Sequence, residues 1–541
     1  MSKDIELPLG KRTKLYRFLE ILPGALSYAA VILLFILSYF APILASIYLL
    51  LIISTTLVKA IAVAFRTWQG FETVKKAEKV DWRQRVLDLE KPHEAYERLK
   101  ETKSEKYGID EHIENLKKLS IAEAGRFPSP DKVYHAVIMV AYNEGLETII
   151  PSIEAVLNSS FPSERIIFVF GYEARGGEEM RKNAREIKEK YKDKFGGLII
   201  TEHPDGLRGE INGKGPNLCW AGKELSEYVK KKKLRRENVI VTSLDSDNRM
   251  SEGYLDYVAY EFITRENRQK LSYQPVSLFT NNIWDAAAPM RVIAMSNSFF
   301  NIISTMRPQH LRNFASHSQP LEALEGMNYW SKRTIVEDGH QYWRSLFYFD
   351  GDYEVIPIRV PIYQDAVIAE TFLGTLKAQF IQLRRWDYGA SDVAYVGVRL
   401  FDKKRRKISF FELFPKFVRL LDGHVTLAMM SPIVAFGGWV PMIMNLTSRG
   451  MAVFNLPQVV SVVQTIAVVG LFVTILMSMR MLPERPKKYR KMKKLAMVLQ
   501  WILMPIIALV YTSLAGYYSQ TRLMLGKYME NFDVTRKVVK K

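Results

Sequence analysis

Apolar residues are concentrated in two regions of the chain, residues 20–65 and 424–520. The first region has no charged residue from Leu22 to Val58, and Pro42 lies near its middle. This run is too long for one membrane helix of about 20 residues. The pattern therefore predicts two transmembrane helices joined by a tight turn, at about 22–40 and 43–65.

Three further apolar segments predict C-terminal spans at about 424–446, 458–479 and 495–517. The last segment contains Pro505, so a re-entrant path is an alternative to a full span. The stretch between the last two segments, "RMLPERPKKYRKMKK", carries eight basic residues from Arg480 to Lys494. Because Lys and Arg collect in cytoplasmic loops, this stretch is expected inside the cell.

Charge around the first helix pair sets its orientation. The N-terminal flank is basic, whereas the turn between the two helices has no Lys or Arg. Both flanks, and the large region that follows residue 66, are therefore expected in the cytoplasm. Lys59 lies inside the second helix and is expected to extend toward the cytoplasmic end.

The middle of the chain alternates short β-rich runs with helical stretches over residues 131–368. Strands separated by helices are typical of a parallel α/β sheet. Four strands are predicted, in "VYHAVIMVAYN", "RIIFVFGY", "GLIITEH" and "NVIVTSLDSD". Charged residues 66–130, mostly helical in pattern, connect this domain to the first helix pair.

Two amphipathic segments follow the domain, at about 370–388 and 408–421. In "ISFFELFPKFVRLLD" the charged side chains share one helical face, and the aromatic side chains fall largely elsewhere. Such a helix can lie in the membrane interface. An ordinary surface helix has the same pattern and stays an alternative.

Composition narrows the class of partner and of metal site. The formal net charge of +19 fits nucleic acid, anionic lipid or a phosphorylated substrate. Cytoplasmic loops of a membrane protein account for most of this excess, and the basic runs lie beside apolar segments, so no nucleic acid partner is expected. Cys219 is the one cysteine, and the eight histidines show no metal-binding spacing. A bound metal would be a hard ion held by carboxylates, Mg²⁺ or Mn²⁺.

Polar side chains follow the predicted strands, at the edge where α/β sheets bind ligands. They are Asn143 and Glu144 after the first strand, Glu173 after the second, Lys214 and Asn217 near the start of a helix, and Asp245 and Asp247 after the fourth. The first pair would also suit a helix N-cap, and the Asp-x-Asp would also suit a turn or cap. Residues i and i+2 of a strand point to the same side, so Asp245 and Asp247 can converge on one cation.

Two later groups have the same chemical character. "RTIVEDGHQYWR" places Glu337 and Asp338 before an aromatic, basic helix. "AQFIQLRRWDYG" places Gln382, Arg385 and Trp386 within one and a half helical turns. An interface helix with an extended Arg and a belt aromatic is the alternative for this second group.

In this order and spacing, the four groups resemble family 2 glycosyltransferases, the membrane-integrated processive type that includes cellulose, chitin and hyaluronan synthases. The resemblance spans about residues 135–390. It implies an α/β fold: a GT-A-type nucleotide-sugar-binding domain with a mostly parallel sheet, flanked by N- and C-terminal transmembrane helices and by interface helices. It also implies a UDP- or GDP-sugar donor, a Mg²⁺ or Mn²⁺ ion, and inversion at the anomeric carbon.

The resemblance assigns a role to each site residue. Donor binding falls to Asn143, Glu144, Glu173, Lys214 and Asp245, where Glu173 stands at a position that is usually Asp in the family. Metal binding falls to Asp247 with Asp245, and the catalytic base is Asp338. The acceptor and pyrophosphate side falls to Glu337, Gln382, Arg385 and Trp386.

A short motif near the C-terminus resembles the gating loop of cellulose synthases. It is "NFDVTRK", with Phe532, Val534, Thr535 and Lys537 at the matching positions. Five full spans would put this basic tail outside the cell, whereas its charge favours the cytoplasm. A cytoplasmic tail is therefore predicted.

The resulting division of the chain has seven parts. They are 1–21, cytoplasmic N-terminus; 22–65, two transmembrane helices; 66–130, helical elbow; 131–368, glycosyltransferase domain; 369–423, amphipathic interface helices; 424–517, C-terminal transmembrane segments; and 518–541, basic tail.

The expected function is sugar transfer to a growing polysaccharide or glycolipid at the cytoplasmic face of the cell membrane, with the lipid bilayer as a further partner. A non-processive transferase that makes a lipid-linked sugar is the first alternative. A membrane transporter or sensor that binds a nucleotide sugar without chemistry is the second. A transporter should carry charged residues within its spans, and here Lys59 is the exception among almost none.

Overall fold

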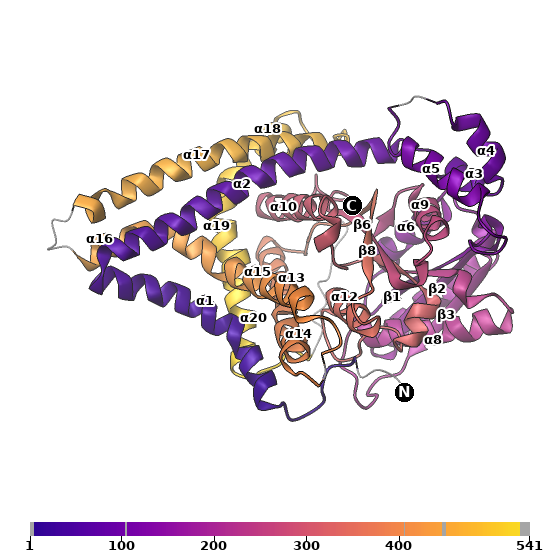
Figure 1. Ribbon diagram of the computed structural model, residues 1–541, viewed down its shortest axis with the longest axis horizontal. Coiled ribbons are helices and arrows are strands. Elements are labelled where there is room, and N and C mark those ends of the chain that lie inside the picture. Colours follow the sequence, from indigo (N-terminus) through magenta and orange to yellow (C-terminus); the bar gives the residue numbers. More distant parts are fainter. Residues whose placement is uncertain (1–4, 103–104, 405, 446–450, 531–541) are drawn as a thin grey trace.

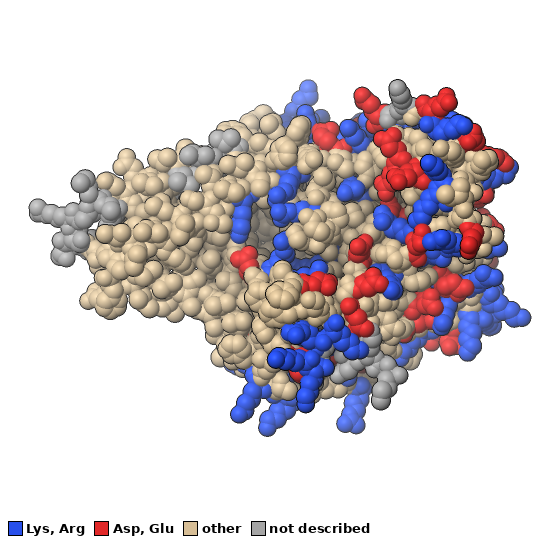
Figure 2. All heavy atoms as spheres, viewed as in Figure 1, with Lys and Arg blue, Asp and Glu red and all other residues tan. Residues whose placement is uncertain are grey.

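The computed structural model describes residues 5–102, 105–404, 406–445 and 451–530. Long helices extend at one end of the molecule, and a sheet with its covering helices forms the other end (Figure 1). The helical end consists largely of α1 (Lys14–Phe40), α2 (Pro42–Glu78), α15 (Phe410–Phe436), α16 (Val440–Met444) and α17 (Met451–Met481). Figure 2 shows almost no charged side chains on this end and a dense mixture of both signs on the other.

Four helical stretches in the described part of the chain are long and apolar enough to cross a membrane. They are Lys14–Phe40, Pro42–Glu78, Phe410–Met444 and Met492–Met524. The side chain of Thr13 caps the first by accepting the N–H of Tyr16 at 3.2 Å, and Pro42 starts the second. The prediction of apolar helices on both sides of an α/β domain is confirmed.

One predicted boundary falls inside a helix. The interface helices were expected to end at residue 423 and a membrane span to begin at 424, but α15 runs unbroken from Phe410 to Phe436. The change from an amphipathic to an apolar pattern reflects what surrounds the helix, and it does not interrupt the backbone. Arg419 therefore lies within a candidate membrane span.

Eight strands form one sheet within the described residues, in the order β3-β2-β1-β4-β7-β6-β8-β5. Their bounds are β1 Tyr134–Ala141, β2 Ile166–Glu173, β3 Gly197–His203, β4 Val239–Asp245, β5 Arg249–Met250, β6 Leu271–Leu278, β7 His317–Pro320 and β8 Glu354–Tyr363. β1 to β4 pair in parallel, as do β6 and β8, whereas β7 and β5 run antiparallel to their neighbours. The sheet is mixed, and its parallel half consists of the four predicted strands.

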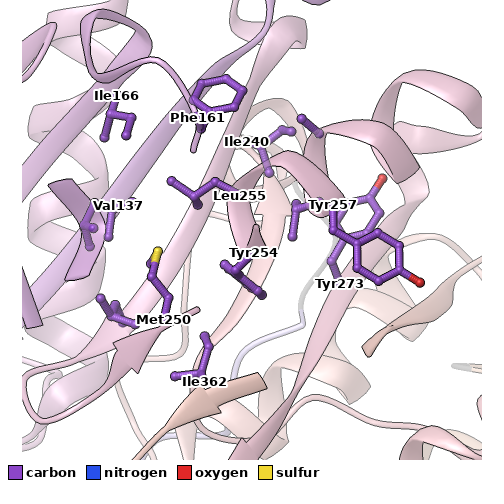
Figure 3. Close-up of a cluster of buried hydrophobic side chains, with 14 of the residues drawn as sticks. Val137, Phe161, Ile166, Ile240, Met250, Tyr254, Leu255, Tyr257, Tyr273 and Ile362 are labelled. Carbon is purple, nitrogen blue, oxygen red and sulfur yellow. The ribbon is translucent and has the colours of Figure 1, made fainter. Parts of the chain in front are cut away.

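Helices cover both faces of this sheet because successive side chains of a strand point to opposite faces. Val137 and Met139 on β1 contribute to a core shared with α6 (Leu146–Leu157), α7 (Gly177–Tyr191) and α9 (Tyr254–Thr264). Ala136 and Ile138 face the other way, toward α8 (Lys214–Lys231) and α11 (Leu321–Gly326). Figure 3 shows part of the first core, where side chains from strands and from α9 interleave.

The elbow between α2 and the sheet is tied to the first core. It consists of α3 (Trp82–Asp88), α4 (Pro92–Leu99) and α5 (Ile109–Ser120). The indole of Trp82 stacks on the Tyr257 ring of α9, with centroids 3.5 Å apart. In the chain, α10 (Ala288–Thr305) lies between β6 and β7, and α12 (Glu337–Tyr348) lies between β7 and β8. Two further helices, α13 (Phe372–Asp387) and α14 (Asp392–Phe401), follow β8.

The last apolar stretch begins and ends beside the α/β domain. It comprises α18 (Met492–Leu499), α19 (Met504–Ile507), a π-helical turn at Ala508–Ser513 and α20 (Leu514–Met524). Just before it, the Tyr489 hydroxyl donates to the Asp285 carboxylate at 2.5 Å. At its far end, Arg17 donates to the Leu523 carbonyl at 3.0 Å, next to the start of α1. Both ends therefore lie on the side of the domain, which favours the re-entrant alternative over a full span.

Candidate active site

One cavity of about 1070 Å³ lies where the sheet meets the helical end. Figure 2 shows the hollow at this junction, with Lys and Arg side chains beside it. The cavity wall contains all eleven residues proposed from the sequence: Asn143, Glu144, Glu173, Lys214, Asp245, Asp247, Glu337, Asp338, Gln382, Arg385 and Trp386. Groups that are scattered over about 240 positions of the sequence thus line one cavity.

The loop after β1 forms part of the wall. The Glu144 carboxylate accepts the backbone N–H of Tyr142 at 2.7 Å and that of Asn143 at 3.1 Å. This ties the loop into a tight turn ahead of α6, whose N-cap is Gly145 with no side-chain cap. The helix-cap alternative for the first pair is therefore wrong. The Asn143 amide oxygen is buried without a hydrogen-bond partner among the described residues, and it is available to a ligand.

Glu173 ends β2 and is paired with a neighbouring guanidinium. Arg175 donates its Nε–H to the Glu173 carboxylate at 2.9 Å and lies 4.6 Å from the centroid of the Tyr142 ring. Burial raises the pKa of Glu173, and Arg175 opposes the rise. A planar guanidinium over an aromatic ring, fixed by a carboxylate, offers a flat polar wall.

Lys214, the first residue of α8, is the electrostatic centre of the site. Its ammonium lies 2.5 Å from the Asp245 carboxylate and 3.5 Å from that of Glu337. Burial would lower the Lys214 pKa, but Asp245, Glu337 and Asp338 together raise it, so the ammonium stays charged. This cation connects the end of β4 to the start of α12.

Asp245 is the last residue of β4, and Asp247 lies in the turn that leads to β5. The Asn248 N–H donates to the Asp245 carbonyl at 3.0 Å, so the turn alternative for this motif is correct. The same turn also aims both acidic residues at the cavity. The Asp247 carboxylate accepts the Asp365 N–H at 3.4 Å. Turn formation and ligand binding are thus compatible here.

Glu337 and Asp338 occupy the first turn of α12. The two Asp338 oxygens accept the backbone N–H of Ala315 at 2.6 Å and of Gly339 at 2.7 Å, which fixes the carboxylate. Glu337 is 3 % exposed. Burial raises its pKa to about 7, while Lys214 opposes the rise. Two adjacent acids thus sit in different environments, one fixed by backbone donors and one buried against an ammonium.

Gln382, Arg385 and Trp386 lie on α13 and face the cavity, so they do not form a belt on the outer surface. Gln379 donates its amide N–H to the Gln382 side-chain oxygen at 3.0 Å. Arg385 is close enough to Glu337 to lower that carboxyl's pKa. The Trp386 indole is 37 % exposed and lies 6.2 Å from the Phe279 ring.

The residues fit a divalent cation in part. No group of three or more His, Cys, Asp or Glu side chains with metal-binding geometry occurs among the described residues. Mg²⁺ is commonly held by one or two carboxylates together with substrate phosphates, and the Asp245–Asp247 turn provides such a pair. Asp247 is the better placed of the two, because Asp245 already pairs with Lys214.

Sequence reasoning missed the half of the cavity next to the helical end. Its wall contains Arg307, His310, Arg312, Arg419, His424, Asp387 and Asp392. These residues come from α13, α14, α15 and the segment after α10, and they share no spacing. Only their common position in the fold reveals them.

Comparisons with known proteins give structural likenesses alone. No protein-family model and no curated protein sequence matches the chain. The chain is similar to the mannosyltransferase PcManGT from Pyrobaculum calidifontis in complex with GDP-Man and Mn²⁺, with 11% identity, 77% of this chain and 97% of that chain covered, and a TM-score of 0.41. It is similar to TarS 1–349 of S. aureus, with 12% identity, 73% and 93% covered, and a TM-score of 0.34. It is also similar to GalNAc-T7 with UDP, GalNAc and Mn²⁺, with 9% identity, 55% and 58% covered, and a TM-score of 0.31. Likenesses this distant do not assign an activity, which has to be argued from the cavity.

Proposed function

We propose that this protein is a membrane-integrated glycosyltransferase of family 2 type, with a GT-A-type domain that takes a sugar from a UDP- or GDP-sugar and passes it to a glycan or a lipid-linked acceptor. One observation carries the proposal. All eleven residues that the family resemblance assigns to donor, metal, base and acceptor line a single cavity. The motifs were selected by order and spacing alone, so their convergence is independent support.

The donor would bind at the carboxyl ends of β1, β2 and β4. The Asn143 oxygen and the Tyr142–Arg175 wall offer a polar edge and a flat face for the nucleoside. Lys214 and Arg385 provide cationic donors for the diphosphate. Asp247, with Asp245, would hold a Mg²⁺ or Mn²⁺ ion. Such an ion neutralises charge on a diphosphate leaving group.

The acceptor would lie between Asp338 and Trp386. A sugar hydroxyl is a poor nucleophile, and a carboxylate within reach can take its proton as the bond to the anomeric carbon forms. Two backbone N–H donors fix the Asp338 carboxylate for this task. The Trp386 ring offers an apolar face for the C–H side of a sugar. One base and one direct displacement give an inverted product.

Charge and one ion pair support a cytoplasmic position for the domain. The loop from Arg480 to Lys494 is basic, and Lys488 in it pairs with Asp285 of the domain at 2.8 Å. A basic loop that contacts the domain is what the positive-inside rule leads us to expect if both are cytoplasmic. The protein would thus be a multi-pass protein of the cell membrane with a cytoplasmic active site. The gating motif at Phe532–Lys537 lies outside the described residues, and its role remains a prediction.

Turnover of a nucleotide sugar tests the proposal. Full-length protein in lipid bilayer discs is incubated with a panel of UDP- and GDP-sugars and Mn²⁺, and release of the nucleoside diphosphate is measured. At least one donor should be turned over, and removal of the metal by a chelator should stop the release. If no donor in the panel is turned over, the non-catalytic binding alternative replaces this proposal.

A further inference from the structure

Part of the cavity wall is formed by basic residues that are not among the eleven proposed from the sequence. They include Arg307 and Arg312 from the segment after α10, and Arg419 from α15. We call these three residues and His310 the basic chamber. Among the described residues, none of the three arginines forms an ion pair with a carboxylate, although each faces the cavity.

The chamber cations act on one another. Burial and the charges of Arg66 and Arg419 lower the pKa of Arg307. Burial lowers the pKa of Arg312, Tyr342 and Asp392 oppose this shift, and Arg419 adds to it. Asp392, one of the acids that share the cavity wall with these arginines, is bonded to His340 at 2.6 Å. Like charges gathered without a counter-ion are unfavourable unless an anion binds between them.

Arg419 lies in the first part of the candidate membrane span Phe410–Met444, a part that also carries Glu412, Lys416 and Asp422. A charged side chain near the end of such a span can reach the polar boundary or a cavity. Arg419 faces the cavity, together with Gly423 and His424 one turn further along the same helix.

The rim of the chamber is apolar and open. Phe300 lines the cavity and is 61 % exposed, and its ring lies 5.9 Å from that of Phe314. On α15, Phe411 and Val418 are also exposed. Exposed apolar side chains on helices that suit a membrane are the surface that acyl or similar chains contact. Cations inside and apolar side chains outside match one kind of ligand, an amphiphile with an anionic head.

From this arrangement we infer that the basic chamber binds the phosphate group of a membrane lipid, held by Arg307, Arg312 and Arg419, with the lipid chains along the Phe300 rim. The inference rests on the proposed function and narrows its acceptor: the accepting group is carried by a phosphorylated lipid. A phosphate in the chamber would lie in the same cavity as Asp338 and Trp386, so the lipid would deliver its acceptor group from the bilayer side.

Lipid binding can be measured without any nucleotide. Full-length protein is purified in detergent, and retention of added phosphatidic acid is quantified by native mass spectrometry. Diacylglycerol, which has the chains without the phosphate, and inorganic phosphate, which has no chains, are the two comparison probes. Phosphatidic acid should bind at least about tenfold more tightly than either, because each probe lacks one half of the contact.

Substitutions locate the lipid. The double variant Arg312→Gln/Arg419→Gln should weaken phosphatidic acid binding by about tenfold or more. Neither arginine has an ion pair to lose, so the variant is expected to fold. Lys416→Gln is the matched control, since it removes a positive charge from α15 at a residue outside the cavity wall. This control should bind phosphatidic acid within about twofold of the wild type.

Three outcomes would overturn the inference. Binding of phosphatidic acid by the double variant as tight as by the wild type would place the lipid on an outer basic surface. Binding of inorganic phosphate as tight as that of phosphatidic acid would indicate a soluble anion as the ligand. If the wild type retains no phosphatidic acid, the chamber does not bind this lipid. The proposed function is tested separately, because Asp338→Asn should retain phosphatidic acid even though turnover is lost. Lipid binding without turnover of any donor would refute the transferase and leave the lipid site standing.

Discussion

The two ends of the cavity hold charge in opposite ways. At the donor end, Lys214 lies between Asp245 and Glu337, and both carboxylates are within 3.5 Å of its ammonium. At the membrane end, Arg307, Arg312 and Arg419 face the cavity without an acidic partner among the described residues. The first arrangement is a network of opposite charges that helps to stabilise the fold. The second is unfavourable for stability unless an anion binds between the arginines.

Stability measurements on single variants should separate the two ends most clearly. Lys214→Met leaves two acids without their cation, and breaking a buried pair in this way costs about 3–5 kcal/mol. Arg312→Gln removes a buried cation that has no ion pair with a carboxylate among the described residues, so the unfolding temperature should change much less. Both are measured by thermal unfolding in detergent, with Lys223→Met, exposed on the same helix as Lys214, as the control. A loss of stability in the arginine variant as large as in the lysine variant would remove the distinction.

The donor end should also respond to pH. Burial raises the pKa of Glu337 to about 7, so the folded protein binds a proton there that the unfolded chain, with a pKa near 4.5, releases. Its contribution to stability is present below pH 4.5 and is lost as the pH rises to 7, by up to about 3 kcal/mol. In Glu337→Gln this part of the pH dependence should disappear. Thermal unfolding of both proteins across this range measures the difference, and parallel curves would contradict it.

Metal dependence is expected at the donor end alone. Asp247→Ala should weaken binding of UDP or GDP in the presence of Mn²⁺ by about 10–100-fold, because the carboxylate best placed for the ion is removed. Binding without Mn²⁺ should be weak and equal in both proteins. Isothermal titration of the nucleotide, with and without the metal, provides the comparison. Wild-type affinity that does not depend on the metal would exclude this role for Asp247.

The smallest effect is expected where the two ends meet. Trp386→Phe keeps an aromatic face but shortens it, so KM for the acceptor should rise by less than about tenfold while kcat stays near the wild-type value. Phe279→Leu, behind the indole, should act in the same direction and more weakly. Steady-state kinetics at saturating donor measures both changes. A fall in kcat without a change in KM would move Trp386 from acceptor binding to another role.

The donor end could be predicted from the sequence because each of its groups is local. Asn143, Asp245 and Asp338 stand at strand ends or helix starts, where the apolar pattern itself shows the edge of the sheet. The parallel strands β1 to β4 were predicted for the same reason, since each contains a short run of apolar residues. Short or interrupted strands such as Arg249–Met250 give no such signal.

The membrane end could not be predicted. Arg312 and Arg419 lie more than a hundred residues apart, and neither stands in a motif. A charge run in a sequence looks the same whether its members are paired or not. The meaning of these arginines depends on the absence of an ion pair to a carboxylate among the described residues, which only the fold reveals. The unbroken path of α15 was missed because amphipathic and apolar patterns suggested two separate elements.

Sugar transfer in this cavity is tested most directly by turnover of one accepted nucleotide sugar. The wild type, Asp338→Asn and Asp352→Asn are compared in the same bilayer discs. Asp352 is an exposed acidic residue of the same domain, with 65 % of its side chain accessible, and it lies outside the cavity wall. We expect a loss of about 100-fold or more for Asp338→Asn, with nucleotide binding retained, and no change for Asp352→Asn. Turnover by Asp338→Asn at the wild-type rate would contradict the assignment of this cavity as the site of sugar transfer.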